Sequence, residues 1–230
     1  MTAGLSCVVI ACQGGSRIVW QSTGLALKFF WRRLPLMILA NAVWLLLSVP
    51  IVTWPAATAG LYTLTASVVR EELDDATHET KFTVFWDGFR AHGVRATLLT
   101  LMGVGGVGIV AVGLRFYSLS ALEPFRWLVG PIALIGLVWI AAQLFVYPLL
   151  VQRPELGPVS LVREALLTAI AYPLVTIPLL LTSLVLALAA VILLGPVLLV
   201  FFSAMAMLQT VIVRLLLVER GEIAVDGGAT

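Results

Sequence analysis

Long apolar stretches without a charged side chain alternate along this chain with short segments where the charges gather. Four stretches contain no Asp, Glu, Lys, Arg or His, and they cover residues 34–69, 96–114, 127–152 and 165–213. A helix needs about 20 apolar residues to cross about 30 Å of membrane hydrocarbon. The second and third stretches therefore predict one membrane span each, and the fourth is long enough for two.

Turn signals divide the longer stretches. Leu194-Gly195-Pro196 lies where the fourth stretch has to reverse, and Gly-Pro is a strong turn signal. The first stretch is broken at Pro50 and again at Pro55, which predicts one full span and then a short returning helix from Ala56 to Val69. At 1.5 Å per residue, these roughly fifteen residues reach only about 22 Å. Length alone therefore leaves the crossing of this helix open.

The distribution of Lys and Arg decides whether the short helix crosses, because these residues accumulate in cytoplasmic loops. If it crosses, the chain has six spans with both termini in the cytoplasm, and only two of its 14 basic residues lie outside, Arg115 and Arg126. If it does not, the best split is eight to six. In the six-span arrangement, the twelve cytoplasmic basic residues are Arg17, Lys28, Arg32, Arg33, Arg70, Lys81, Arg90, Arg95, Arg153, Arg163, Arg214 and Arg220.

The fold class that follows is an all-α membrane protein, a six-transmembrane helix bundle with a short second helix and cytoplasmic N- and C-termini. We expect a flexible tail over residues 1–26, a single transmembrane domain over 27–218 and a C-terminal tail over 219–230. The spans are predicted at about 33–54, 56–70, 95–115, 127–150, 171–193 and 196–216.

Composition agrees with this class and excludes several others. Hydrophobic residues make up 61% of the chain and charged residues 11%, and the mean hydropathy is +1.08. Soluble domains have about 45–50% apolar and about 25% charged residues, so a soluble enzyme and a disordered regulator are excluded. A net charge of +2 is too small for a nucleic-acid binder.

The largest predicted cytoplasmic loop, residues 70–95, ends in an aromatic segment. Phe82, Phe85, Trp86 and Phe89 recur at the spacing of one helix face. Basic residues, among them Arg90, flank this face, which predicts a cytoplasmic interfacial helix near 82–93 with its rings dipping into the lipid bilayer. A helix packed on the protein's own cytoplasmic end is an equal alternative, and docking to a cytoplasmic partner is a third.

Motifs that could carry chemistry are weak. The sequence from Gly103 to Gly108 has the dinucleotide-binding spacing, but it lies in the middle of a span, where small residues let another helix approach closely. Gly106 and Gly113 are expected to share that face. The two cysteines, Cys7 and Cys12, and the histidines, His78 and His92, form no zinc-binding or catalytic pattern. We therefore predict no catalytic residue, no metal, no cofactor and no enzyme activity.

Polar but uncharged side chains remain inside the predicted spans, and the second helix is rich in hydroxyl groups. Hydrogen bonding between helices is the simplest role for these side chains. A second possibility is that the second helix lines a shallow cavity, open to the outside, where sugar hydroxyls find partners. The residues are Asn41, Ser48, Thr58, Tyr62, Thr63, Thr65, Ser67, Gln143 and Gln209.

A pattern at the first two predicted helices resembles the signature of the YesL-like family of bacterial integral membrane proteins, a domain of unknown function (624). Its typical run reads N-x-x-W-x-x-x-x-x-P-x-x-T-x-G-P-A-x-x-A-L-Y. The similarity is specific over Leu34 to Leu101 and includes the run from Phe85 to Arg90, which is similar to the family's F-x-x-x-F-[KR] helix. This chain has Pro55-Ala56-Ala57 where the family has Gly-Pro-Ala. The matching residues are Asn41, Trp44, Pro50, Thr53, Pro55, Ala56 and Tyr62.

The resemblance implies a bacterial plasma membrane and an association with carbohydrate uptake, often beside ABC sugar importers, and it brings no catalytic residue. We expect a non-enzymatic accessory protein that binds importer subunits. The alternative is a permease-like subunit that itself moves a small solute, for which Glu164-Ala165 followed by Ile177-Pro178 is a faint similarity to an importer coupling loop.

Overall fold

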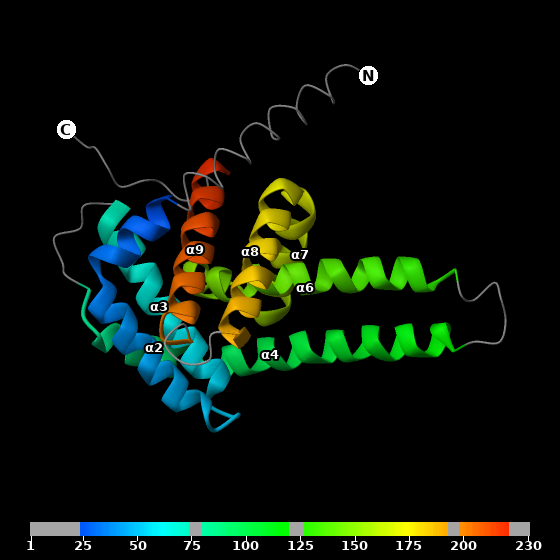
Figure 1. Ribbon diagram of the computed structural model, residues 1–230, viewed down its shortest axis with the longest axis horizontal. Coiled ribbons are helices and arrows are strands. Elements are labelled where there is room, and N and C mark those ends of the chain that lie inside the picture. Colours follow the sequence, from blue (N-terminus) through cyan, green and yellow to red (C-terminus); the bar gives the residue numbers. More distant parts are fainter. Residues whose placement is uncertain (1–23, 74–79, 120–126, 193–197, 221–230) are drawn as a thin grey trace, which may run out of the picture.

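The computed structural model describes residues 24–73, 80–119, 127–192 and 198–220, and within these ranges it contains helices and no strands (Figure 1). The predicted all-α class is therefore confirmed. A helical segment, Gly24–Arg32, precedes the first labelled helix. The labelled helices are α2 (Leu34–Ser48), α3 (Trp54–Leu73), α4 (Thr83–Ser118), α6 (Val129–Gln152), α7 (Pro158–Ala171), α8 (Pro173–Ile192) and α9 (Leu198–Glu219).

Some sequence predictions lie outside the described residues. These are the turn at Leu194-Gly195-Pro196, the cysteines Cys7 and Cys12, the residue His78 and most of both predicted tails.

Two helices, α4 and α6, are each long and apolar enough to cross a membrane. Two further pairs pass the same test if each bent pair is one span: Gly24–Arg32 with α2, bent by 89°, and α7 with the first part of α8, bent by 102°. By length and composition, the described residues thus contain two to four candidate spans and indicate a membrane protein. The six spans predicted from the sequence exceed these two to four candidate spans.

The structure corrects the prediction of a separate interfacial helix near 82–93. Residues Thr83–Ser118 form one helix of 36 residues, about 54 Å long, so the aromatic segment and the predicted span at 95–115 are continuous. Gly93 lies inside this helix, where an added Cβ would be 3.3 Å from the Ala56 side chain. The carbonyl of Gly93 also accepts a hydrogen bond from Thr97 Oγ1 at 2.9 Å.

The second predicted helix is longer than expected. Helix α3 has 20 residues, about 30 Å, and continues through Arg70 and two glutamates to Leu73. Its charged end is stabilised because Glu71 and Glu72 pair with arginines near the start of the chain. Helix α3 contacts α2, α4, α6 and α9, and most of its side chains are buried.

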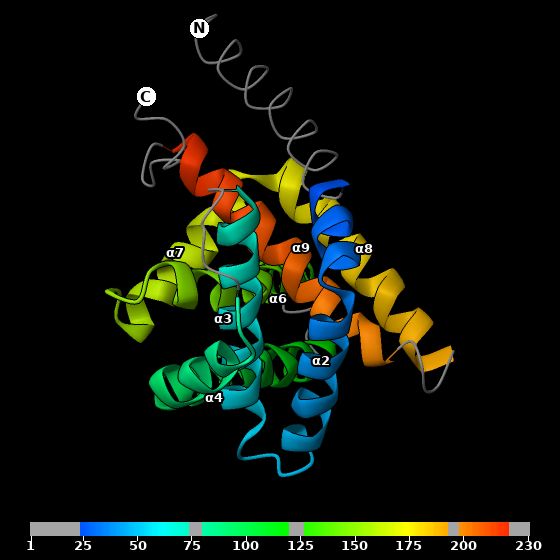
Figure 2. The same ribbon diagram turned by 90° about the vertical axis from the view of Figure 1, so that its left-hand side faces the viewer.

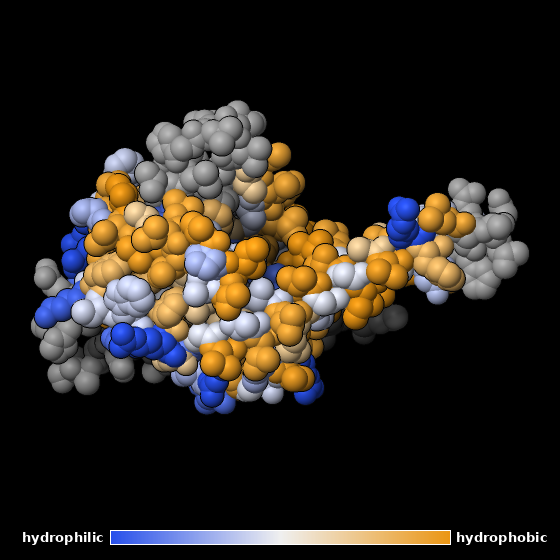
Figure 3. Space-filling view, turned by 90° about the horizontal axis from the view of Figure 1, so that it is seen from below, coloured by the Kyte–Doolittle hydropathy of each residue, from blue (hydrophilic) through white to orange (hydrophobic). Residues whose placement is uncertain are grey.

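Helices α4 and α6 form a hairpin that projects from the rest of the molecule (Figure 1). Most of the projecting surface is apolar, as Figure 3 shows along the hairpin. Exposed side chains include Val104, Ile109 and Leu134, with exposed fractions of 62%, 77% and 62%. Such a surface is typical of contact with lipid, because water-soluble monomers rarely expose large continuous apolar patches.

Glycines set the distance between the two helices of the hairpin. An added Cβ on Gly136 would lie 2.6 Å from Val110, and one on Gly106 would overlap the Trp139 indole. Gly113 faces the same helix, with Ile132 at 3.7 Å from an added Cβ. The predicted close helix approach is confirmed at Gly106, whereas Gly113 faces the same helix at an ordinary van der Waals distance.

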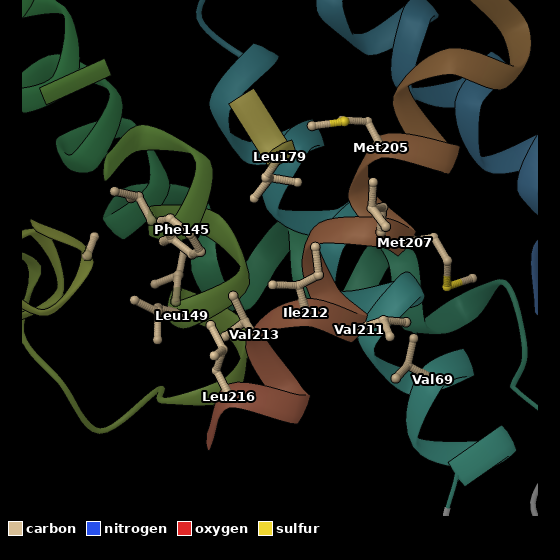
Figure 4. Close-up of a cluster of buried hydrophobic side chains, with 14 of the residues drawn as sticks. Val69, Phe145, Leu149, Leu179, Met205, Met207, Val211, Ile212, Val213 and Leu216 are labelled. Atoms are coloured by element: carbon tan, nitrogen blue, oxygen red, sulfur yellow. The ribbon is translucent and has the colours of Figure 1, made fainter. Parts of the chain in front are cut away.

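The remaining helices enclose the hydrophobic core. Figure 2 shows α2 and α3 side by side, with α9 passing diagonally between them in this view. Figure 4 shows the larger buried cluster, in which Met207 and Ile212 of α9 lie among side chains of α3, α6 and α8. A second cluster joins α2, α3 and the start of α4 around Leu61 and Phe85. Close packing of these side chains supplies the van der Waals contacts that hold α3 and α9 at the centre.

Candidate functional site

A cavity of about 310 Å³ lies where the first turn of α3 meets the α4–α6 hairpin. Helix α3 contributes two residues, Trp54 and Thr58, and the hairpin contributes the rest. The hairpin residues are Leu99, Thr100, Gly103, Val104 and Val107 of α4 and Gln143, Val146 and Tyr147 of α6. None of these side chains carries a charge, so the lining is mainly apolar with a few neutral polar groups.

Most of the polar groups of the cavity already have partners in the protein. Thr100 Oγ1 and the Tyr147 hydroxyl are hydrogen-bonded at 2.6 Å. Thr58 Oγ1 accepts a hydrogen bond from Trp44 Nε1 at 3.1 Å and donates one to the Trp54 carbonyl at 2.8 Å. Because these hydroxyls are used inside the protein, they offer a ligand little hydrogen-bonding capacity.

Gln143 is different from the other polar residues of the cavity. Its Nε2 donates to the Trp139 carbonyl at 3.5 Å, a long hydrogen bond, and its Oε1 accepts none from the described residues. An added Cβ on Gly103 would lie 2.7 Å from this Oε1. The absence of a side chain on Gly103 therefore lets the carboxamide lie against α4. Gln143 therefore has hydrogen-bonding capacity to spare inside the cavity.

A row of neutral polar residues lies behind the cavity. The Tyr147 ring stacks on Tyr62 with ring centroids 5.5 Å apart, and the Tyr62 hydroxyl donates a hydrogen bond to Gln209 Oε1. Thr65 and Thr210 are 3.3 Å apart between their hydroxyl oxygens. These contacts join α3, α6 and α9, which is the interhelical role predicted for such side chains.

The hydroxyl-rich second helix only partly faces the cavity. Of its polar residues, Thr58 lines the cavity, whereas Tyr62 and Thr65 are buried between helices. Thr63 and Ser67 donate to the carbonyls of Ala59 and Thr63 in their own helix, at 2.8 and 3.1 Å. The second helix therefore contributes only Trp54 and Thr58 to a cavity, and the sequence did not assign Thr100, Gln143 and Tyr147 to its polar lining.

The first residues of the family pattern pack into the core. Asn41 is fully buried on α2, and Trp44 is 5% exposed. The Trp44 ring lies 4.0 Å from the Phe202 ring between centroids, and its Nε1 holds Thr58. Trp44 thus connects α2 to α9 and to the cavity wall.

The remaining family residues build the turn between α2 and α3. Thr53 Oγ1 donates to the Pro50 carbonyl at 2.9 Å and to the Leu47 carbonyl, and Ser48 Oγ donates to the Trp44 carbonyl at 2.7 Å. Pro55 is the second residue of α3, where a missing N–H costs nothing. Ala56 faces Gly93 of α4. These residues are therefore placed for structure, at the end of α3 that borders the cavity.

The aromatic segment of α4 divides into a buried and an exposed part. Phe85 is fully buried, and an added Cβ on Gly60 would lie 2.7 Å from its carbonyl oxygen. Trp86 is 39% exposed and contacts the edge of Phe89, and Arg90 is exposed. Phe82 is half-buried and stacks on Phe85. For Phe85, the structure shows packing on the protein itself and not contact with the bilayer surface.

Two arginines near residue 33 pair with the charged end of α3. Arg32 Nη1 lies 2.5 Å from Glu72 Oε2, and Arg33 pairs with Glu71, which also accepts a hydrogen bond from the Thr80 N–H at 2.9 Å. Burial by itself would raise the pKa of the Glu71 carboxyl. The hydrogen bonds from Thr80 and the two guanidinium groups outweigh burial, so this pKa lies below its ordinary value.

A second charged cluster ties α9 to α7. Arg220 Nη1 donates to Glu164 Oε1 at 2.7 Å and Nη2 donates to Thr168 Oγ1 at 3.1 Å. The guanidinium also lies 5.1 Å from the centre of the Tyr172 ring. Glu164 is thus engaged inside the protein, and its neighbour Ala165 is fully buried.

Clusters of metal-binding side chains are absent from the part of the chain that the structure describes: no three His, Cys, Asp or Glu residues there come together to hold an ion. Asp74 and His78, whose spacing in the sequence would place them on one helix face, lie outside that part.

Comparison with known proteins finds one family match, which lies within the first half of the chain. Residues 37–114 match the model of a family described as "Protein of unknown function, DUF624". The match includes both segments that carry the sequence resemblance, 41–62 and 85–90, and it confirms that resemblance. No curated protein and no solved structure matches the chain.

Proposed function

We propose that this chain, with its DUF624 segment at residues 37–114, is a multi-pass protein of the bacterial plasma membrane that acts without catalysis. In this proposal it is an accessory or regulatory component that binds subunits of an ABC-type carbohydrate importer. The observation that carries the proposal is the surface at the start of α4 where Trp86 and Arg90 are exposed beside the half-buried Phe89, which we call the aromatic surface.

The aromatic surface has the composition and the rigidity that a docking site needs. Trp and Arg are enriched among the residues that contribute most binding free energy at protein interfaces. The segment is held from behind by Phe85, which is buried, and by Gly88, whose missing side chain lets α4 lie against Thr63. A surface fixed in this way loses little conformational entropy on binding.

Six spans with cytoplasmic termini are part of the proposal. Two contacts between distant segments support the cytoplasmic grouping of the charges. The pairing of Arg32 with Glu72 brings together the start of the chain and the end of α3. Arg95 Nη1 donates to the Pro154 carbonyl at 2.5 Å, so the basic residues around positions 95 and 153 also lie at one level.

Copurification from native membranes tests the docking function. The full-length chain, tagged and solubilised in mild detergent, should recover importer subunits identified by mass spectrometry. Truncating an interface residue of this kind costs about 2 kcal/mol or more, so the double variant Trp86→Ala, Arg90→Glu should reduce recovery by more than about tenfold. Trp127→Ala is the matched control, because Trp127 is 83% exposed but lies just before α6, away from the aromatic surface in the sequence.

A permease-like subunit is the second candidate, and the cavity beside Gln143 is the observation that favours it. Uptake by vesicles that contain the chain, an ATPase and a binding protein would distinguish the two. The accessory function predicts uptake only when separate permease subunits are present. Uptake without them would replace the first proposal with the second.

A further inference from the structure

We infer that the cavity between α3, α4 and α6 binds an acyl chain of a neutral glycerolipid, with a hydroxyl or ester group of that lipid at the Gln143 carboxamide. The cavity is called the acyl-chain pocket below. The inference concerns a ligand of the protein itself, and it does not depend on the aromatic surface or on an importer.

The position of the pocket points to a ligand that comes from the lipid phase. Val104 and Val107 line the cavity and are also exposed at its edge, with exposed fractions of 62% and 42%. Both belong to the charge-free length of α4, residues 96–114, whose outer surface is apolar. The pocket therefore opens onto the same surface that contacts membrane hydrocarbon.

The lining selects against charged and highly polar ligands. No Lys, Arg, His, Asp or Glu lines the pocket, so a phosphate or carboxylate inside it would lose its hydration without gaining a counter-charge. A sugar would lose hydration at many hydroxyl groups, yet few side chains of the lining, Gln143 among them, have hydrogen-bonding capacity to spare. An acyl chain that carries one or two neutral polar atoms matches this lining.

The size of the pocket fits part of a lipid. A volume of about 310 Å³ is at the lower end of the range of ligand pockets, about 300–1,000 Å³. It accommodates a segment of one acyl chain, whereas the rest of the lipid stays in the bilayer. Leu99, Val104 and Val146 provide the apolar walls for that segment.

Gly103 supports the polar end of the pocket. Because an added Cβ would lie 2.7 Å from Gln143 Oε1, any other residue at this position would displace the carboxamide from α4. The glycine thus keeps both the space for a chain and the position of the hydrogen-bonding group.

Photolabelling tests the inference directly. The full-length chain is placed in nanodiscs of phosphatidylcholine that contain a diacylglycerol with a diazirine group on one acyl chain. After illumination, the labelled peptides are mapped by mass spectrometry, with unlabelled diacylglycerol or maltose as competitor. We expect label on residues 99–107 and 143–147, and we expect unlabelled diacylglycerol to displace it while maltose does not.

Three variants make the test specific. Val107→Trp places a large ring at the mouth and should remove most of the label, whereas Ile109→Trp puts the same ring on the exposed surface outside the pocket and should not. Gln143→Leu keeps the size of the side chain and removes its polar atoms, so binding should weaken about threefold to tenfold. Circular dichroism and gel filtration check that each variant is folded.

Other outcomes would overturn the inference. Equal labelling of the Val107→Trp and Ile109→Trp variants would mean that the lipid contacts only the outer surface. Displacement by maltose would assign the pocket to a sugar. An unchanged affinity in Gln143→Leu would remove the carboxamide from recognition. None of these results bears on copurification through the aromatic surface, so the two proposals fail separately.

Discussion

At the residue scale, the closest contacts between helices depend on a missing side chain. Gly60, Gly88, Gly103, Gly106 and Gly136 each lie where an added Cβ would come within 3 Å of a neighbouring helix. The sequence predicted this use for Gly106 and Gly113, because small residues in a span let helices approach. It could not predict the partner residues, since those follow from the register between α4 and α6, which no local pattern specifies.

Gly106→Ala tests this packing. The new methyl group would overlap the Trp139 indole, a rigid ring whose Nε1 also donates to the Gly103 carbonyl at 3.1 Å. Overpacking of this kind costs about 1–3 kcal/mol, so we expect a lower midpoint of thermal unfolding in detergent, followed by circular dichroism. Gly108→Ala is the control, because nothing lies within 4 Å of an added Cβ there. Equal midpoints for the two variants would contradict the close contact.

At the element scale, the sequence identified most helices but not all of their ends. Apolar length and proline breaks predicted α6, α8 and α9 within a few residues. The same patterns placed a helix boundary near residue 95. The structure has no boundary there, because a change from aromatic and charged to apolar residues does not interrupt a helix. They also made α3 too short, since the paired charges that continue it, Arg33 with Glu71 among them, come from a distant segment.

The Glu71 contacts give the charged end of α3 a pH-dependent stability. Because the pKa of Glu71 is lowered in the folded protein, its contribution is complete above the ordinary carboxyl pKa of about 4.3 and is lost as the pH falls through the lowered value. We expect the unfolding midpoint of the native protein to fall over this acidic range. Glu71→Gln should lower stability at pH 7 by up to about 1 kcal/mol and make the acidic loss shallower.

The control for Glu71 is Glu155→Gln, a change at an exposed residue in the segment between α6 and α7. This variant should keep the pH dependence of the native protein. If Glu71→Gln and Glu155→Gln gave the same pH profile, the pairing with Arg33 and Thr80 would contribute nothing to stability.

At the scale of the whole molecule, α4 extends well beyond α3. The first half of α3 packs against the first third of α4, as the contacts Gly60–Phe85 and Ala56–Gly93 show. The apolar length of α4 then continues with α6 as its main neighbour. Sequence patterns place each span in a membrane separately. They do not contain the offset between neighbouring helices, which is why the sequence left a position beside the bilayer surface and packing on the protein itself as equal alternatives for the aromatic segment.

This arrangement makes a specific prediction for the two ends of α4. Arg90 and Arg115 are both exposed, and the charge-free residues 96–114 between them cover about 28 Å, close to the thickness of the hydrocarbon layer. If α4 crosses the membrane, these two positions lie on opposite sides.

Single cysteines introduced as Arg90→Cys and Arg115→Cys, in a chain without Cys7 and Cys12, should therefore react differently with a membrane-impermeant maleimide. We expect Arg115→Cys to be labelled in intact cells and Arg90→Cys only after the membrane is opened. Inside-out vesicles provide the control, because they should reverse the pattern, and a partner that merely shields position 90 would not produce such a reversal. Labelling of both positions from the same side would show that α4 lies along the membrane, and the proposed topology would then be wrong.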